Sequence, residues 1–306
     1  MMSAMHTKGH DVPRGRLLLN EPMSRHTSWR AGGPADRFYI PADLDDLALY
    51  IKSLPAAEPL YWVGLGSNLL VRDGGLRGTV IMTSGALNGL SLLGDGDIRA
   101  EAGIACAKAA RFSVSSGLVG GEFLAGIPGT IGGALAMNAG AFGGETWKIV
   151  HAVETLDRDG EIRKRPAADY RVSYRHVEGP LNRKGDEWFV AGYFRLPPGE
   201  ASKAKTLIKS LLAKRGATQP TQLPNAGSVF KNPPNDFAAR LIEASGLKGT
   251  REGNACVSDL HANFIVNAGG ATAADIERLI QHVQTEVERQ HGVRLETEVR
   301  MIGEHL

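Results

Sequence analysis

The sequence predicts an α+β protein built from more than one compact part. Its 306 residues suit about two domains, or three small ones. A hydrophobic content of 42% and a charged content of 22% are typical of a globular chain. The order of predicted strands and helices changes twice along the chain. We therefore expect a flexible extension at 1–20, two N-terminal parts at 21–85 and 86–200, and a C-terminal α/β part at 201–306.

The first part is predicted from a capped helix and two short strands. Asp43 precedes an apolar helical stripe that ends before Pro55. Leu60–Val63 then has the pattern of a strand, a glycine turn occupies 64–68, and Leu69–Val71 forms the next strand. A helix followed by a strand, a glycine turn and a second strand indicates a small α/β unit.

The other two parts mix the same elements differently. From residue 78 to about 196 the pattern predicts strands at 79–83, 98–102, 150–156 and 188–196, a helix at 104–116, and a glycine-rich run. In the third part it predicts a helix at 203–214, a helix capped by Asp236 that ends at Gly246, a strand at 261–267, a long helix from Thr272 to Gly292, and a last strand at 293–302.

Charge and cysteine usage exclude several classes of protein. The net charge is only +2 and the basic residues are scattered, which argues against a nucleic-acid partner. Cys106 and Cys256 lie far apart, and no Cys or His cluster has the spacing of metal ligands. We expect two reduced thiols, no metal site and a cytoplasmic location.

The sequence does not predict an export signal or a membrane span. Residues 1–20 lack the apolar centre of a signal peptide. The segment 118–142 is nearly uncharged and long enough to span a bilayer, but its many glycines suit a ligand-binding loop better. We therefore expect no membrane insertion.

The most informative segment is the turn at 225–233. It brings together the hydroxyl of Ser228, the ammonium of Lys231 and the carboxamide of Asn232. A glycine before the serine allows close approach of the backbone, and two prolines end the segment. Serine is a weak acid and a weak base, so Ser228 needs a neighbour such as Lys231 or a bound anion to activate it. The alternative is an ordinary polar turn.

Two glycine loops indicate a ligand that carries phosphates. The loop at 64–68 follows a strand, but Leu69 replaces the third glycine of a dinucleotide fingerprint, so a Rossmann site is excluded. Its small residues still let backbone N–H groups converge on an anion. The loop at 126–134 has four glycines around Pro128, and a large flat cofactor could lie against it. Together they favour a ligand with two phosphates.

Five segments in one order resemble a known family. They are 27–35, 63–73, 121–145, 225–233 and 295–299, and they cover nearly the whole chain after its N-terminal extension. In these segments the chain is similar to the UDP-N-acetylenolpyruvoylglucosamine reductases, flavoenzymes of peptidoglycan precursor synthesis, in their shorter type II form. The resemblance implies a vanillyl-alcohol-oxidase-type fold, in which two subdomains hold FAD and a C-terminal α/β domain closes over the substrate.

The resemblance also implies the chemistry. FAD, reduced by NADPH, would deliver hydride to C3 of the enolpyruvyl group, and a proton would reach C2 to give UDP-N-acetylmuramate. FAD is expected to be non-covalent, because neither glycine loop contains a Cys or His to form a link. The residues expected to bind it are Arg30, Gly64, Gly66, Ser67, Asn68, Leu69, Gly126, Ile127, Pro128, Gly129, Gly132, Gly133, Ala134 and Asn138.

Three catalytic residues follow from the same resemblance. Ser228 matches the proton donor of the family, Arg175 matches an arginine that follows a tyrosine, and Glu298 matches a glutamate of the last strand. Arg171 is an alternative to Arg175, because 170–173 fits the family's Tyr-Arg-x-Ser pattern literally. Glu296 is an alternative to Glu298, because strand alternation puts both on one face.

Four further residues are expected on the substrate side: Tyr174, Lys231, Asn232 and Asn263. We expect a monomer whose partners are UDP-N-acetylenolpyruvoylglucosamine and NADPH. Two other functions remain open at this point. One is a flavin oxidase or dehydrogenase for an alcohol or hydroxy acid, and the other is a nucleotide-binding regulatory module that has no need of the three catalytic residues together.

Overall fold

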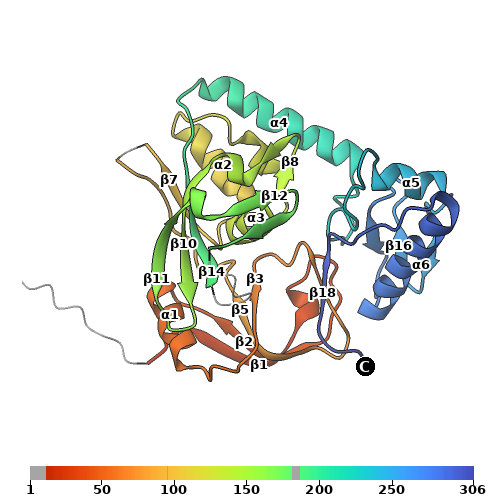
Figure 1. Cartoon of the computed structure of the whole chain (residues 1–306), viewed down its shortest axis with the longest axis horizontal. Coiled ribbons are helices and arrows are strands. Elements are labelled where there is room, and N and C mark those ends of the chain that lie inside the picture. Colours follow the sequence, from red (N-terminus) through yellow and green to blue (C-terminus); the bar gives the residue numbers. More distant parts are fainter. Residues whose placement is uncertain (1–11, 95, 181–186) are drawn as a thin grey trace, which may run out of the picture.

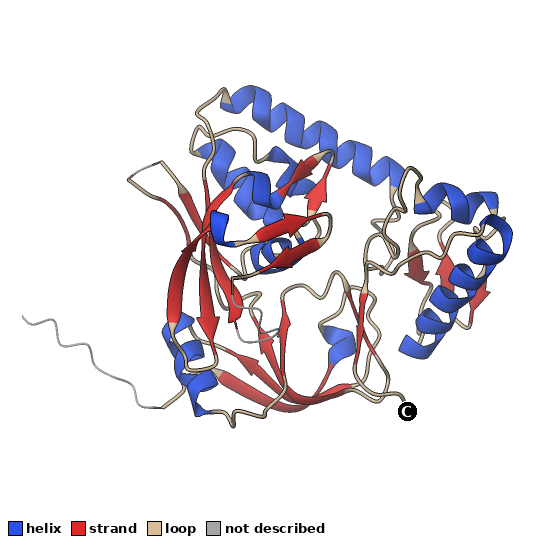
Figure 2. Cartoon of the chain, viewed as in Figure 1, coloured by secondary structure: helices blue, strands red, loops and turns tan. Residues whose placement is uncertain are grey.

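The computed structural model describes residues 12–94, 96–180 and 187–306. It contains two α+β bodies and a C-terminal α/β domain (Figures 1 and 2). The first body is a four-stranded sheet in the order β1-β2-β5-β3. Its strands are β1 (Arg16–Pro22), β2 (Pro34–Ile40), β5 (Leu76–Met82) and β3 (Leu60–Val63).

Part of the expected N-terminal extension is ordered, so that prediction is wrong for residues 16–20. They belong to β1, which pairs antiparallel with β2 from Arg16 opposite Ile40 onward. The partner of an edge strand does not show in its local sequence, and Leu17 and Leu19 of β1 are exposed. Residues 1–11 of the expected extension lie outside the described residues.

The second body is a five-stranded antiparallel sheet covered by helices (Figure 1). The strand order is β11 (Ile162–Pro166), β10 (Val150–Asp157), β14 (Glu187–Phe194), β7 (Ile98–Glu101) and β6 (Leu90–Leu92). Helices α2 (Cys106–Ser115) and α3 (Ile131–Met137) and the 3-10 turn η2 (Glu122–Gly126) pack in its core. The segment 118–142 therefore folds as short elements.

Helix α1 (Leu44–Ser53) joins the two bodies. Asp43 caps it as predicted, by accepting a hydrogen bond from the Asp46 N–H at 2.8 Å. On its buried face, Leu47 and Ile51 share a core with residues of both sheets, including Leu156 of β10. The two N-terminal bodies are thus packed against each other across a common apolar layer.

Helix α4 (Ala201–Thr218) runs from the second body towards the C-terminal domain (Figure 1). Its buried residues, Ala204 and Ile208, belong to the core of the second body. Leu207 and Leu212 have the helical spacing of a buried face, but they are 46% and 38% exposed. Helical spacing predicted the helix, but it did not predict which face lies against a neighbour.

The C-terminal domain contains a small sheet and two helices. Its strands are β15 (Arg251–Glu252), β16 (Ala255–Val257) and β17 (Ile265–Asn267), and its helices are α5 (Ala238–Ala244) and α6 (Ala273–His291). Helix α6 is confirmed as predicted: Thr272 and Asp275 form a capping box, and Gly292 ends the helix at φ +66°.

Three predicted boundaries in this domain are wrong. Asp236 does not cap α5; Phe237 is at the cap position, and Asn232 accepts a hydrogen bond from the Ala238 N–H. The strand at 261–267 is confined to β17. The strand at 293–302 is confined to β18 (Arg300–Ile302), which pairs in parallel with β4 (Leu69–Val71) of the first body. The residues before β17 and β18 use their backbone groups to hold the serine turn instead.

Several contacts fix the C-terminal domain to the first body. The buried Trp29 lies in the C-terminal core and donates from its indole nitrogen to the Ile265 carbonyl at 2.8 Å. Arg72 forms an ion pair with Glu277 of α6 at 2.9 Å. Asp73 accepts hydrogen bonds from the first N–H groups of α6.

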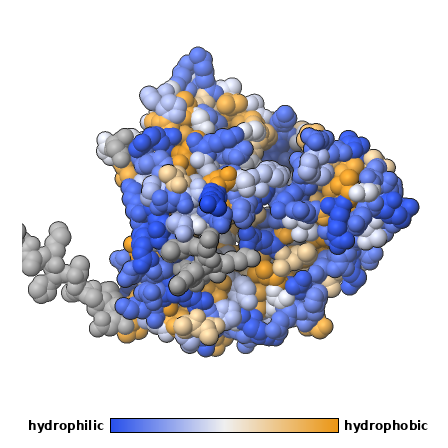
Figure 3. Space-filling model, in the orientation of Figure 1, coloured by the Kyte–Doolittle hydropathy of each residue, from blue (hydrophilic) through white to orange (hydrophobic). Residues whose placement is uncertain are grey.

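Polar and charged side chains cover most of the face in Figure 3, and apolar patches on it are small and separated. None of the helices in the described part of the chain is both long enough and apolar enough to cross a membrane. Cys106 and Cys256 are both free and buried.

Candidate active site

A central cavity of about 590 Å³ lies where the three parts of the protein meet. This volume is in the range of cofactor and ligand pockets. The glycine turn at 64–68, the glycine loop at 126–134, the serine turn and the start of β18 all line it. Two further cavities share lining residues with it and therefore adjoin it: a side cavity of about 790 Å³ and an outer cavity of about 750 Å³.

The turn at 64–68 keeps its shape because its glycines are tightly confined. Gly66 has φ +60°, and a Cβ there would lie 2.1 Å from the His26 carbonyl oxygen. Gly64 is similarly confined, since its Cβ would lie 2.3 Å from the Thr130 hydroxyl. The turn at 64–68 is therefore in direct contact with the loop at 126–134. Both loops were assigned to the cofactor from the sequence.

The loop at 126–134 leads into α3, and one of its glycines faces open space. A Cβ on Gly133 would find its nearest neighbour, the Thr130 hydroxyl, at 3.9 Å, and Gly133 lines both the central and the side cavity. The lack of a side chain there leaves room that the protein itself does not fill. This fits a large flat cofactor lying against the loop.

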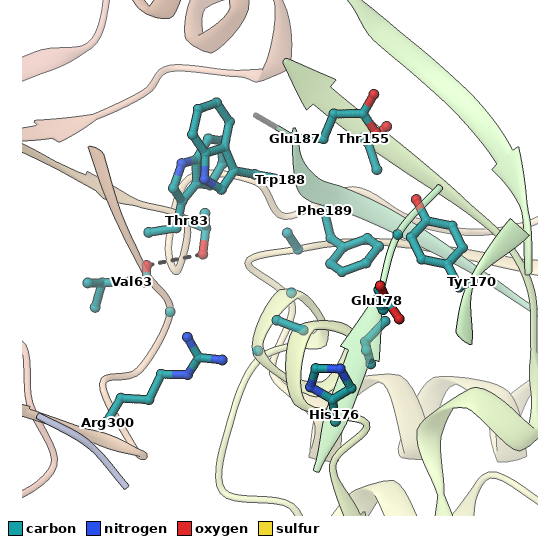
Figure 4. A pocket seen from close by; sticks show the side chains of 18 of the residues that line it. Val63, Thr83, Thr155, Tyr170, His176, Glu178, Glu187, Trp188, Phe189 and Arg300 are labelled. Atoms are coloured by element: carbon teal, nitrogen blue, oxygen red, sulfur yellow. Dashed lines mark hydrogen bonds between the residues drawn. The ribbon is translucent and has the colours of Figure 1, made fainter. Parts of the chain in front are cut away.

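The side cavity supplies aromatic walls and unpaired polar atoms. Trp62 and Trp188 stack with ring centroids 5.1 Å apart. Figure 4 shows Trp188, Phe189 and Tyr170 around the hollow, with Arg300 pointing into it from the opposite side. The Trp62 indole nitrogen and the Tyr170 hydroxyl are buried, and neither has a hydrogen-bond partner among the described residues. Buried polar groups usually have partners, so these two atoms fit a ligand with polar edges.

Ser228 reaches the central cavity from a turn that is held on both sides. The Asn225 side chain accepts a hydrogen bond from the Gly227 N–H, and Gly227 has φ +75°. After the serine, the Val229 N–H donates to the Asn263 carbonyl, and the Val229 carbonyl accepts from the Glu298 N–H at 2.8 Å. Ser228 is half-buried and lies beside the Glu298 segment.

Arg175 and Glu298 form a shielded ion pair at the cavity wall. Arg175 Nε donates to Glu298 Oε1 at 2.6 Å, with 18% and 12% of the two side chains exposed. Loss of hydration raises the pKa of Glu298, and the attraction of Arg175 only partly offsets this. Glu298 therefore binds a proton more readily than an ordinary glutamate.

The alternatives from the sequence lie elsewhere. Arg171 has 89% of its side chain exposed and does not line any of the three cavities. Glu296 has 77% of its side chain exposed and forms an ion pair with Lys231 at 3.3 Å. The strand pattern predicted for Glu296 and Glu298 does not hold, because the regular strand begins only at Arg300.

The residues expected on the substrate side are engaged in other contacts. Asn263 is buried and binds both the N–H and the carbonyl of Phe230. Asn232 accepts from the first N–H of α5, and Lys231 pairs with Glu296. Tyr174 is 53% exposed and lies against the Arg175 guanidinium at 5.3 Å. None of the four lines the central cavity.

Most of the residues expected to bind the cofactor line the central cavity, and three do not. Arg30 lines the outer cavity and Gly132 the side cavity. Asn138 is buried and lines none of the three. The others are Gly64, Gly66, Ser67, Asn68, Leu69, Gly126, Ile127, Pro128, Gly129, Gly133 and Ala134.

Two arginines at the cavity were missed from the sequence. Arg215 of α4 donates to Gln219 at 3.2 Å, and burial lowers its pKa. No carboxylate pairs with it in the described part of the chain. Arg300 follows Glu298 by two residues, a spacing that could have revealed it; Arg215 gave no signal on a helix of many charges. Glu298 is the one acidic residue among the described residues that line the central cavity, so the cavity suits an anionic ligand.

Two family comparisons agree with this geometry. Residues 35–165 match the FAD binding domain family, and residues 219–302 match the family described as UDP-N-acetylenolpyruvoylglucosamine reductase, C-terminal domain. The fold and the cavity thus define an FAD-containing oxidoreductase, and the predicted class, two FAD-binding subdomains of the vanillyl-alcohol-oxidase type with a C-terminal α/β domain, is confirmed.

Whole-chain relatives specify the family further. UDP-N-acetylenolpyruvoylglucosamine reductase of Alkalilimnicola ehrlichii is 59% identical over 96% of this chain and 97% of its own length. The Thiobacillus denitrificans enzyme of that name is 55% identical over 99% of this chain and 98% of its own. The crystal structure of the Thermus caldophilus reductase matches with a TM-score of 0.79 and 31% identity, covering 94% of this chain and 98% of that one. The chain belongs to the UDP-N-acetylenolpyruvoylglucosamine reductase family.

Proposed function

We propose that this protein uses FAD and NADPH to reduce UDP-N-acetylenolpyruvoylglucosamine to UDP-N-acetylmuramate in peptidoglycan precursor synthesis. The observation that supports this most is that Ser228, Arg175 and Glu298 line the same cavity as both glycine loops. A hydroxyl beside a shielded arginine and carboxyl suits protonation next to a substrate carboxylate. A nucleotide-binding regulatory module has no need of this combination.

The glycine loops at 64–68 and 126–134 would hold the flavin, which would supply hydride-transfer chemistry between NADPH and C3 of the enolpyruvyl group. The residues of the chain then handle the charge and the proton. Ser228 donates a proton to C2. Before that, negative charge develops beside the substrate carboxylate, and Arg175 stabilises it in a site where water is scarce.

Glu298 pairs with Arg175 in this proposal and takes up a proton more readily than an exposed glutamate. Loss of hydration raises its pKa, so it can hold a proton where an exposed glutamate would not. A protonated carboxyl can donate a hydrogen bond to the developing charge, as Arg175 does. Arg215 and Arg300 add positive charge for the phosphate groups of cofactor and substrate.

A non-covalent flavin is supported by the composition of the cavity wall. Neither cysteine nor histidine occurs among the described residues that line the central cavity. We propose a cytoplasmic monomer, and the two free, buried cysteines fit a reducing compartment. Acid or heat precipitation should release all yellow colour into the supernatant; colour that stays with the pellet contradicts a non-covalent cofactor.

The decisive experiment has two steps under anaerobic conditions. NADPH should bleach the flavin absorbance, and UDP-N-acetylenolpyruvoylglucosamine should then restore it. A simple hydroxy acid added to the oxidised enzyme in place of NADPH is the matched control, and it should leave the flavin oxidised. A flavin that NADPH does not bleach, or that the UDP-linked substrate does not reoxidise, contradicts the proposal.

A further inference from the structure

Asn138 occupies an unusual position next to the active site without lining it. It ends helix α3 in the left-handed conformation at φ +41° and is 2% exposed. None of the three cavities includes it among its lining residues. Its place in the fold therefore requires an explanation other than contact with the cofactor.

The Asn138 side chain uses all of its hydrogen-bonding groups within the protein. Its Nδ2 donates to Glu145 Oε2 at 3.1 Å and to the Ser173 carbonyl at 3.2 Å. Its Oδ1 accepts from the Trp147 N–H at 3.2 Å. An amide offers two donors and one carbonyl, and each is engaged. Asn138 thereby connects α3 to two neighbouring segments and to the hairpin that carries Arg175.

That hairpin consists of β12 (Arg171–Ser173) and β13 (His176–Glu178), with a two-residue loop of Tyr174 and Arg175. All three residues of β12 are exposed, so burial does little to fix its orientation. The Asn138 carbonyl also accepts from Arg175 Nη1 at 3.3 Å. One residue therefore binds the hairpin backbone just before the loop and the arginine at its tip.

We propose that Asn138 is a positioning residue that holds Arg175 towards Glu298 and the substrate carboxylate. The inference rests on the proposed role of Arg175. Through Ser173, the amide fixes where the loop begins, and through its own carbonyl it limits the rotation of the guanidinium. Loss of the amide frees the hairpin while leaving the glycine loops and cavity walls as they are.

Asn138→Asp is the sharpest variant, because it preserves shape and tolerates the left-handed conformation. It replaces the donating NH2 by an oxygen that faces Glu145 and the Ser173 carbonyl. Asn138→Gly is the second variant; it removes the same bonds without backbone strain. Both should purify with wild-type flavin content and be reduced by NADPH within about threefold of wild type. Reoxidation by the UDP-linked substrate should slow at least tenfold.

A double-mutant cycle distinguishes positioning from a general structural defect. If Asn138 acts through Arg175, Asn138→Asp combined with Arg175→Ala should reoxidise no more slowly than Arg175→Ala alone. Effects that multiply would overturn the proposal. So would loss of flavin from both Asn138 variants, or reoxidation of both within threefold of wild type.

A readout without substrate separates this inference from the proposed function. In flavin-loaded enzyme, the backbone amides of 171–178 should exchange hydrogen faster in Asn138→Asp than in wild type. Equal exchange overturns the positioning role whatever the substrate is. Wild-type enzyme that the UDP-linked substrate fails to reoxidise contradicts the proposed function instead.

Discussion

At the scale of single residues, the backbone of Arg175 is strained. It has φ +55° in a two-residue loop between Ser173 and His176, a conformation that glycine or asparagine adopts more readily. Such strain costs on the order of 1–3 kcal/mol and is concentrated at functional sites. The position of the guanidinium beside Glu298 gives the strain a reason.

Replacing Arg175 by alanine should slow reoxidation of the flavin by substrate at least a hundredfold, a loss of roughly 3 kcal/mol that is typical of removing a charge-stabilising group. Reduction by NADPH should change much less, because that step builds no enolate. Arg171→Ala is the matched control on the same hairpin. Stopped-flow traces in which Arg171→Ala slows reoxidation a hundredfold and Arg175→Ala does not would identify Arg171 as the catalytic arginine.

Glu298 should make stability depend on pH in a direction opposite to that of an exposed, paired carboxylate. Its pKa is raised above the usual 4.5 in the folded protein, so the folded state favours the protonated form. Stability linked to this group is therefore complete below that value and is lost as pH rises through the raised pKa.

Glu298→Gln keeps the shape and removes this titration. Its melting temperature relative to wild type should rise as the pH increases upward from 4.5. Thermal melts of both flavin-loaded proteins across this range measure the difference. Glu296→Gln is the control for replacing a glutamate in the same segment, because Glu296 is 77% exposed and does not line the central cavity. A Glu298→Gln difference that falls as pH rises would show that Arg175, not dehydration, governs the carboxyl.

At the scale of elements, α3 is a short helix whose second and third residues are glycines without side chains. Glycine costs a helix about 1 kcal/mol relative to alanine, so Gly132 and Gly133 weaken α3. Gly132 has a packing reason, because its Cβ would lie 2.9 Å from that of Ala102. Gly133 has none within the protein, and we propose that the cofactor is the reason.

Gly133→Val should therefore fold but lose at least nine-tenths of its flavin. A Cβ at this position meets nothing closer than 3.9 Å within the protein, and the valine side chain would occupy space where two cavities meet. The ratio of visible to ultraviolet absorbance measures flavin content, and circular dichroism checks the fold. Gly216→Val is the matched control, because Gly216 lies in α4 with nothing near its Cβ. Full flavin in Gly133→Val would mean that the cofactor lies elsewhere.

Local sequence predicted the elements whose signals are contained within them. Asp43 and Thr272 cap their helices, and β3, β4 and α6 have the predicted positions. Elements that depend on distant partners were missed or mispredicted. β1 needs β2, β18 needs β4, and the cap of α5 comes from Asn232 rather than from the adjacent Asp236.

At the scale of the whole molecule, the C-terminal domain and the first body behave as one packed unit. The Trp29 side chain lies in the C-terminal core, and β18 adds to β4. Arg72 and Glu277 form an ion pair with 24% and 9% of their side chains exposed. Removing only one partner of an ion pair shielded to this degree destabilises the protein, because the other charge is left shielded and unpaired.

Glu277→Ala should lower the free energy of unfolding by about 2 kcal/mol, as expected when a hydrogen-bonded charge loses its partner. Glu288→Ala removes the partner of Arg294 in an exposed pair and should cost less than about 1 kcal/mol. Chemical denaturation of the two variants beside wild type gives both values. Equal losses would mean that the ion pair between the domains contributes no more to stability than an exposed surface pair.

The candidate site also has features that local sequence could not predict. Motif order predicted that Ser228 and Glu298 share a site, and both line the central cavity. It could not show that Asn263 and Asn232 hold backbone groups. Nor could it show that Arg215 reaches the cavity from a helix rooted in the second body. Which face a side chain presents depends on packing between parts that are distant in sequence.

Proton delivery by Ser228 is the central step of the proposed reaction. A positioned general acid contributes roughly 10²–10⁴-fold. Ser228→Ala should retain its flavin and its reduction by NADPH, while reoxidation by UDP-N-acetylenolpyruvoylglucosamine slows by at least a hundredfold. Ser228→Cys should recover part of the rate, because a thiol can also donate a proton. Stopped-flow reoxidation of NADPH-reduced Ser228→Ala within about threefold of wild type would contradict the proposed role of Ser228 as proton donor.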